Sequence, residues 1–242
     1  MISSQFLRSI ELDDSKTSSF NSYPFNLPAI KGLTKLELHP KVTFIVGENG
    51  SGKSTLLEAI AVQLGFNAEG GTKNFNFSTK DSHSELHEFI KIIKGFKAPK
   101  DGFFLRAESF YNVATAVDNY EAWESYGNKS LHAQSHGESF LALMMNRFSG
   151  MGLYILDEPE AALSPQRQLA ILTRIHDLVL DDSQFIIATH SPILMAYPDA
   201  WIYHCSEDGI NRIDYKETEH YQVTRDFLSN PERMLKILLN DN

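Results

Sequence analysis

The chain has 242 residues, of which 42% are hydrophobic and 22% charged, and its formal net charge is −9 at pH 7. This balance is ordinary for one α/β domain, and no apolar run approaches the roughly 20 residues that span a membrane. The N-terminal segment lacks a basic start followed by an apolar core, so we read no signal peptide. The single Cys205 excludes an internal disulfide and favours a reducing, cytoplasmic setting. The negative charge does not favour nucleic acid as a partner, although a local basic face stays open.

The first half of the chain predicts strands around one helix. We expect an edge strand and a loop within residues 1–22 and a half-buried strand over 33–40, where apolar and polar residues alternate. Residues 41–46 are nearly all apolar and β-branched, which is typical of a central strand covered on both faces. Apolar residues spaced three and four apart predict a helix over 54–64, and residues 84–96 are a second helix candidate.

The second half alternates between buried strands and helices. Proline follows a capping residue at two of the predicted helix starts. The expected elements are a strand from residue 102, mostly helix over 111–148, a buried strand over 152–160, a helix from 165, a buried strand over 184–192, two short strands over 199–215 and an amphipathic helix over 229–240.

A glycine-rich loop over residues 47–54 reads GENGSGKS and fits G-x-x-x-x-G-K-[ST] between a predicted strand and a predicted helix. Glycines allow positive φ and let backbone N–H groups approach phosphate oxygens, while the helix start adds a positive dipole end. Lys53 is expected to neutralise the β- and γ-phosphates, and Ser54 to ligate Mg²⁺. The alternative is an ordinary strand-to-helix turn, which would not need the lysine and hydroxyl in register. The expected triphosphate-binding residues are Gly47, Glu48, Asn49, Gly50, Ser51, Gly52, Lys53, Ser54 and Thr55.

Two acids, Asp157 and Glu158, end the strand LYILDEPE. Packing alone does not explain carboxylates at the end of a buried strand. Asp157 fits a group that orients the Mg²⁺ shell, and Glu158 fits a general base for the water that attacks the γ-phosphate. The alternative is that both acids face solvent where the strand becomes a loop. The acid pair favours hydrolysis over transfer to a second substrate.

Two further segments have a functional and a structural interpretation. His190 ends the strand QFIIATHSP and is placed to bond a γ-phosphate, but a lone histidine is more often structural. Ser135, Gly137 and Glu138 precede the helix ESFLALMMNRF, where a helix start can receive an anion. The same residues also fit a capping box, in which Ser135 caps the helix and the Glu138 side chain, three residues later, bonds back to the Ser135 backbone N–H. Local evidence favours the capping box.

In this order the motifs resemble those of the ABC-type ATPases, in the RecF/SMC/Rad50-like branch of predicted ATPases (AAA family) that is related to the ATPase part of OLD-family proteins. GENGSGKST resembles the Walker A loop, and LYILDEPE resembles Walker B with Glu158 as catalytic glutamate. QSHGE resembles the signature motif, and ALSP (162–165) resembles the D-loop. His190 occupies the position of the family's switch histidine. Glu108 falls near the position of the family's Q-loop glutamine, the residue that contacts Mg²⁺ or the attacking water.

The resemblance implies a P-loop NTPase fold of the α/β class, with an ABC-ATPase-like mixed sheet, flanking helices and a helical signature lobe. Residues 1–242 would form a single domain, with a core of about 23–66 and 150–204, a lobe of about 108–149 and a C-terminal helix of about 229–240. ATP and Mg²⁺ would lie between two chains of a homodimer. Ser135, Gly137 and Glu138 of one chain would then face the nucleotide held by the other. Lys53, Glu158 and His190 would be catalytic, and the metal would be held by Ser54, Asp157 and Glu108.

Departures from the family pattern reduce the number of function classes to consider. His136 replaces the glycine of transporter signatures, and Gln134 replaces the usual leucine. The 82 residues between Lys53 and Ser135 leave no room for long coiled-coil arms, and the roughly 50 after His190 are too few for a nuclease domain of the Toprim type. We therefore expect a Mg²⁺-dependent ATPase whose ATP-driven homodimer is the motor or switch of a DNA-maintenance or anti-phage defence system. A separately encoded nuclease or toxin would be its effector. An ATP-binding regulatory module and, less favoured, a transporter subunit are the alternatives.

Three weaker signals have structural alternatives. Lysines at 91, 94, 97 and 100 are the best candidate for a DNA-facing stripe, although a solvated face is favoured. The C-terminal stripe of Met234, Leu235 and Leu238 is expected to pack in the core rather than dock a partner. Tyr23 or Phe25 is a candidate for stacking on adenine, with core packing favoured. Two histidines in the segment 83–87 lack the acid placement of a zinc motif.

Overall fold

The larger of two sheets carries the strands that bear the motifs. The computed structural model describes residues 5–13, 15, 21–73, 84–120, 123–161 and 163–239. The strand order is β5-β6-β7-β3-β8-β9, and every neighbouring pair is parallel except β8 and β9. Each residue of β3, β6 and β7 is buried, which confirms the three predicted buried strands. The strands are β3 (Val42–Gly47), β5 (Asp101–Arg106), β6 (Gly152–Asp157), β7 (Gln184–Ala188), β8 (Trp201–Ser206) and β9 (Gly209–Ile213).

A second, antiparallel sheet has the order β2-β1-β4, made of β2 (Lys35–Glu37), β1 (Leu7–Leu12) and β4 (Ile90–Lys94). The expected edge strand at the N-terminus is wrong, because β1 pairs on both sides. The expected helix over 84–96 is also wrong: a 3₁₀ helix, η2 (Glu85–Glu88), leads into β4. The isoleucine-rich run IKIIK has high β propensity, and β1 offers it a free edge to pair with.

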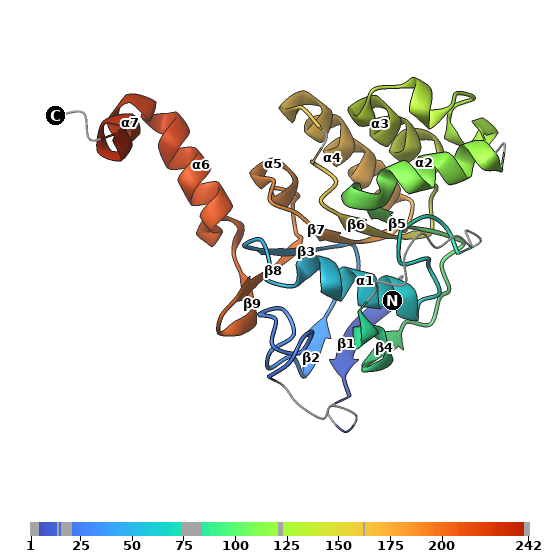
Figure 1. The fold of residues 1–242 in the computed structure, drawn as a ribbon, viewed down its shortest axis with the longest axis horizontal. Coiled ribbons are helices and arrows are strands. Elements are labelled where there is room, and N and C mark those ends of the chain that lie inside the picture. Colours follow the sequence, from blue (N-terminus) through green and yellow to red (C-terminus); the bar gives the residue numbers. More distant parts are fainter. Residues whose placement is uncertain are drawn as a thin grey trace.

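Helix α1 (Lys53–Gln63) lies between the two sheets, as Figure 1 shows. Its sequence LLEAIA is apolar on nearly every side, which is typical of a helix buried all round rather than on one face. Its buried residues belong to the same hydrophobic core as Ile45 and Ile155 of the large sheet and Ile10 of the small one. The helix that follows the glycine-rich loop is therefore fixed from both sides.

Three helices cover the opposite face of the large sheet (Figure 1). They are α2 (Phe110–Asn119), α3 (His136–Asn146) and α4 (Pro165–Leu180), and their apolar faces share a second core with the sheet. Ser164 caps α4, and Pro165 occupies its first turn as predicted. The 3₁₀ turns η4 (Trp123–Tyr126) and η5 (Leu131–Ala133) interrupt the region predicted to be mostly helix, and a further turn, η3 (Ala107–Ser109), precedes α2. The α/β class with a helical lobe is confirmed.

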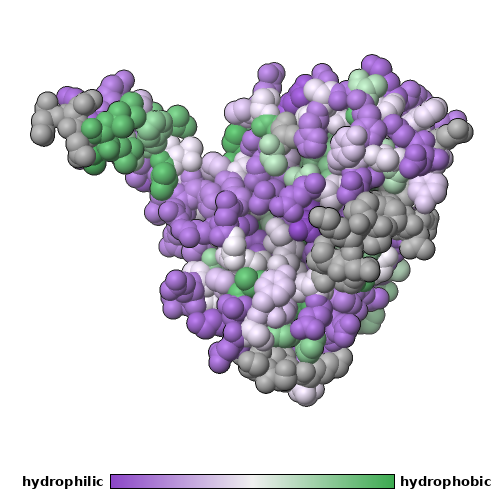
Figure 2. Space-filling model, in the orientation of Figure 1, coloured by the Kyte–Doolittle hydropathy of each residue, from purple (hydrophilic) through white to green (hydrophobic). Residues whose placement is uncertain are grey.

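The C-terminal helices form an arm that projects from the body (Figure 1). After α5 (Pro192–Met195) and η6 (Tyr215–Glu217), the arm consists of α6 (Glu219–Ser229), which the sequence did not predict, and α7 (Pro231–Leu239). The expected core packing of the α7 stripe is wrong, because α7 buries no residue and Leu238 is 64% exposed. Figure 2 shows apolar surface gathered on this arm. Among the described residues, no helix is long and apolar enough to cross a membrane.

Candidate functional site

The glycine-rich loop bends at two positions that only glycine fits well. Gly52 precedes α1 with φ +93°, and a Cβ there would lie 2.9 Å from Cβ of Leu27. At Gly47, φ is +147° and a Cβ would lie 2.6 Å from the carbonyl oxygen of Cys205. Both positions therefore combine a left-handed backbone with a close neighbour. The loop leads directly into α1, and the first backbone N–H groups of this helix have no intrahelical acceptors.

The Lys53 side chain is buried and turns back on its own loop. Its ammonium donates to the carbonyl oxygens of Gly47 at 2.9 Å and Glu48 at 2.8 Å. Burial lowers the Lys53 pKa, while nearby acids, Glu158 and Asp157 among them, oppose that shift. The lysine thus spans the loop that the sequence predicts to cradle phosphates.

Asp157 and Ser54 meet although 103 residues separate them in sequence. Asp157 ends β6, Ser54 opens α1, and the Ser54 hydroxyl donates to Oδ1 of Asp157 at 3.0 Å. Burial raises the Asp157 pKa to about 7, against the opposing effects of Arg106 and of the Ser54 hydrogen bond. The nearby positive charge therefore does not fully compensate the cost of burying this carboxylate.

The acid at position 158 has a strained backbone. Glu158 has φ +52°, and its N–H donates to the carbonyl oxygen of Ala188 at 2.9 Å. Such conformations in non-glycine residues gather at functional sites. The Glu158 Oε1 lies 3.6 Å from Nε2 of His190, and the backbone N–H of His190 donates to Glu160. The loops after β6 and β7 are therefore fastened to each other.

A cavity of about 430 Å³ is bordered by Lys53, Ser54 and Glu158. Tyr23 is 61% exposed at its rim, whereas Phe25 is buried edge-to-face on Phe89, so the core interpretation is right for Phe25 alone. Glu108 is well exposed there, and one of its oxygens lies 3.2 Å from the Arg106 guanidinium. The lining consists of Tyr23, Leu27, Asn49, Gly50, Gly52, Lys53, Ser54, Thr55, Glu108 and Glu158.

The predicted signature residues lie elsewhere, at the start of α3 in the helical lobe. Glu138 accepts hydrogen bonds from the Ser135 backbone N–H at 3.0 Å and hydroxyl at 2.7 Å, and these bonds lower the Glu138 pKa. The predicted pairing of Ser135 with Glu138 is thus present. Ser135 is exposed and Gly137 is buried. None of the three lines the cavity around Lys53.

Arg106 is a residue of the site that the sequence analysis missed. It ends β5 beside Asp157, donates to Glu58 at 2.5 Å, and has its Nε 3.9 Å from Oδ2 of Asp157. Both carboxylates are nearly inaccessible, with side-chain exposures of 8% and 5%. A charged residue ending the apolar run GFFLR was the available signal. Arg106 offsets the charge of Glu58 and part of the charge of Asp157.

We expect Arg106→Met to lower the free energy of unfolding by about 2–4 kcal/mol, because it leaves Glu58 and Asp157 buried without their cation. The matched control is Arg225→Met, which removes an ion pair whose side chains are about half exposed. That change should leave the free energy of unfolding nearly unchanged, because solvent screens exposed ion pairs. Urea unfolding of both nucleotide-free variants measures the difference, and equal shifts would contradict the charge-balancing role.

The four lysines at 91, 94, 97 and 100, considered as a DNA-facing stripe, do not lie along one helix. Lys91 and Lys94 fall on β4, where an odd separation places side chains on opposite faces. Lys91 pairs with Asp13 at 2.9 Å, and Lys97 lies 3.8 Å from Asp182. The four lysines therefore form no single helical face. His83 and Ala162, named in the sequence analysis, lie outside the described residues.

The donor set fits Mg²⁺. This ion usually takes one or two protein ligands and completes its shell with phosphate oxygens and water. Two such ligands are present here: the Ser54 hydroxyl and the Asp157 carboxylate, which are in contact. Burial makes the negative charge of Asp157 costly, so a cation beside it would be stabilising. In the described part of the chain no group of three or more His, Cys, Asp or Glu side chains is placed to hold a metal by itself. A Mg²⁺ ion held by Ser54 and Asp157 would complete its shell with phosphate oxygens and water.

Two family models match the chain. An AAA domain model matches residues 17–126, and an AAA domain model described with the AbiEii toxin of type IV toxin–antitoxin systems matches residues 123–196. Between them the models span the glycine-rich loop, the acid pair and His190.

Curated relatives are distant. Protein McbF of Escherichia coli is 23% identical over 235 residues, which cover 90% of this chain and 91% of McbF. ABC transporter G family member STR2 of Medicago truncatula is 24% identical over 176 residues, and these cover 62% of this chain but only 24% of STR2. The chain thus spans about a quarter of one relative and nearly all of the other.

A solved structure titled as an inward-facing metal-chelate type ABC transporter shares the fold. It is 16% identical, covers 91% of this chain and 88% of its own, and superposes with a TM-score of 0.51. The fold, the AAA domain matches and the contact of Ser54 with Asp157 agree with one another. The chain therefore carries AAA-domain sequence on a P-loop α/β fold.

Proposed function

We propose that this chain hydrolyses ATP with Mg²⁺ in a composite site completed by a second copy of itself. The observation that carries the proposal is the meeting of Lys53, Ser54 and Asp157 at the carboxyl edge of the parallel sheet. ATP is the substrate, and its β- and γ-phosphates would exchange for the carbonyl oxygens that Lys53 now holds. Mg²⁺, held by Ser54 and oriented by Asp157, would neutralise charge on the phosphates. Glu108 would bond to its water shell.

Glu158 would take the proton of the attacking water, and His190 would donate from Nε2 toward the γ-phosphate. The Nε2 atom is buried and has no hydrogen-bond partner within the described residues, which supports a role for a ligand there. Its nearest acid oxygen, on Glu158, lies 3.6 Å away. Base and donor would therefore flank the reacting phosphate.

The second copy would supply Ser135, Gly137 and Glu138. Ser135 is exposed at a helix start, where a dipole and free N–H groups favour an anion. These residues do not line the cavity around Lys53 of the same chain, which supports a site in which each chain would contribute one half. Binding ATP would bring two heads together, and hydrolysis would release them.

The output of this cycle is proposed to be a defence or DNA-maintenance switch acting on a separately encoded toxin or nuclease. The AAA domain model described with a toxin–antitoxin system supports it. Turnover should require Mg²⁺ and stop with EDTA. Recovery of a toxin or nuclease with the tagged protein from its host would support the switch, and stimulation by duplex DNA would favour direct DNA action.

A transporter energy subunit is the second candidate, because STR2 is named as a transporter. The arm gives this candidate a means of attachment, since its apolar side chains are exposed. Recovery of an integral membrane protein with the tagged chain, in place of a toxin or nuclease, would decide for it.

A further inference from the structure

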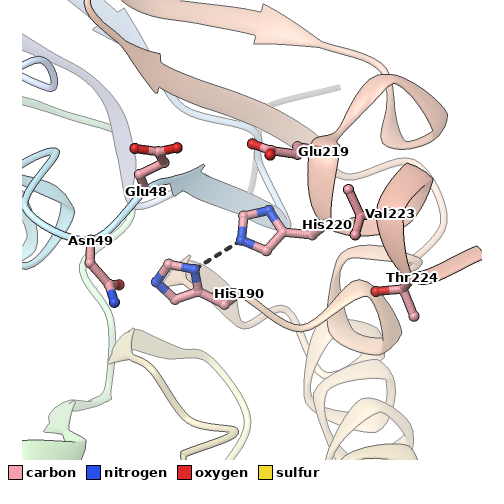
Figure 3. Close-up of a pocket in the computed structure, with 7 residues that line it drawn as sticks. All are labelled: Glu48, Asn49, His190, Glu219, His220, Val223 and Thr224. Atoms are coloured by element: carbon pink, nitrogen blue, oxygen red, sulfur yellow. Dashed lines mark hydrogen bonds between the residues drawn. The ribbon is translucent and has the colours of Figure 1, made fainter. Parts of the chain in front are cut away.

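His220 lies against His190 at the base of the C-terminal arm. Its Nε2 is 2.9 Å from Nδ1 of His190, and the ring centroids are 5.0 Å apart (Figure 3). The pair borders a pocket of about 520 Å³ that Glu48 and Asn49 of the glycine-rich loop also line. A residue of α6 therefore reaches the candidate phosphate site.

The start of α6 is held in place, although the rest of the helix is exposed. Thr218 is buried, and its hydroxyl oxygen caps the helix by accepting from the N–H of Tyr221 at 3.3 Å. Tyr221 packs on Tyr215 with ring centroids 4.7 Å apart. The first turn of α6 is thus anchored to the body, which places the His220 backbone beside His190.

The hydrogen bond between the rings constrains their protons. A neutral imidazole has one N–H donor and one bare nitrogen acceptor. Burial is the largest cause that lowers the pKa of both His190 and His220, so both rings are favoured as neutral. The Nε2 of His190 faces a carboxylate oxygen of Glu158, which only accepts. If Nε2 carries the proton, Nδ1 is bare and needs a donor, which His220 Nε2–H supplies.

We propose that His220 is a positioning residue for ATP hydrolysis: its Nε2–H donates to Nδ1 of His190 and holds the His190 Nε2–H toward Glu158 and the γ-phosphate. The catalytic consequence rests on the function proposed above for His190, whereas the effect on the His190 proton does not. Because His220 belongs to α6, the same bond links the phosphate side of the site to the projecting arm. Movement of the arm would release the His190 ring.

The test compares His220→Ala with His220→Gln, because the glutamine side-chain NH₂ can donate from nearly the same place. Gln222→Ala is the matched control on the same helix. Within the described residues its side chain bonds locally, to the carbonyl oxygen of Lys216. Long-range ¹H–¹⁵N spectra of the nucleotide-free chain report which His190 nitrogen carries the proton. The His190→Ala spectrum assigns the signal among the nine histidines. Steady-state ATP turnover is measured on the same samples.

We expect wild type, His220→Gln and Gln222→Ala to show the Nε2–H form of His190, and His220→Ala to show a mixture. The kcat of His220→Ala should fall about tenfold with KM within about twofold, a part of the roughly 10²–10⁴-fold that placed proton donors and acceptors contribute. His220→Gln should stay within about threefold of wild type. This pattern separates positioning from folding, because a structural role would not be rescued by an amide.

An unchanged His190 proton, or unchanged kcat, in His220→Ala would overturn the inference. If His190→Ala still abolished turnover in that case, the proposed function would stand without it. If instead wild type neither bound nor hydrolysed ATP, the proposed function would fail, and with it the catalytic half of the inference.

Discussion

Replacing Glu158 with Gln is expected to lower ATP turnover by about 10³-fold and to leave an ATP-bound dimer. The amide keeps the size of the side chain but cannot take a proton from water, and a general base contributes roughly 10²–10⁴-fold. Lys53, Ser54 and the glycine-rich loop are untouched, so ATP and Mg²⁺ should still dock. Phosphate release and light scattering with saturating ATP and Mg²⁺ measure the two effects.

Glu85→Gln is the matched control for this change, because it makes the same substitution at an exposed position on η2. It should hydrolyse ATP like wild type and dissociate as ATP is used up. Wild-type turnover in the Glu158 variant would exclude that residue as the base. A monomer at saturating ATP would argue against the two-chain site.

Lys53→Ala is expected to weaken ATP binding by about 10²-fold, equivalent to roughly 2–3 kcal/mol of charge-assisted hydrogen bonding, and to reduce turnover below detection. The ammonium is the cation nearest the loop carbonyls, at 2.8 and 2.9 Å, and no other residue of the loop is basic. Calorimetric titration with ATP and Mg²⁺ measures the affinity.

Lys31→Ala, at an exposed position, controls for the loss of one positive charge. A thermal melt without nucleotide controls for the two lost bonds to the loop, since Lys53 is buried. Unchanged affinity in a folded Lys53→Ala protein would show that the triphosphate is held elsewhere.

The motif-bearing strands could be predicted from the sequence, and the reason is physical. Buried parallel strands are apolar along their whole length, so LYILD and QFIIA have no other good interpretation. Parallel strands end at one edge, which brings Asp157 beside Ser54 without any long-range information. The sequence analysis assigned both residues to Mg²⁺, and the structure brings their side chains into hydrogen-bond contact.

The small sheet and the arm could not be predicted, because distant partners decide them. Strand β1 is central only because β4, about 80 residues later, pairs with it, and that pairing also turned an expected helix into a strand. The α7 stripe has the spacing of a core helix, yet the described chain buries no residue of α7. Periodicity shows that a face is apolar and does not show what covers it.

The site residues that were missed act through other residues. Arg106 and His220 belong to no motif, and their roles follow only from the 3.9 Å approach to Asp157 and the 2.9 Å contact with His190. For Glu138 the contact was predicted, but the contact does not decide its function. Its capping bond was predicted, but capping and anion binding use the same helix start, so its presence does not choose between them.

The two-chain site is tested most directly by mixing Lys53→Ala with Ser135→Arg, each inactive alone. In a mixed dimer, one site combines the intact Lys53 of one chain with the intact Ser135 of the other. We predict that mixing restores ATP turnover, reaching about a quarter of the wild-type rate at equal concentrations if chains pair at random and each intact site works independently. No recovery at any ratio, with both variants folded and Ser135→Arg still binding ATP, would contradict the composite site.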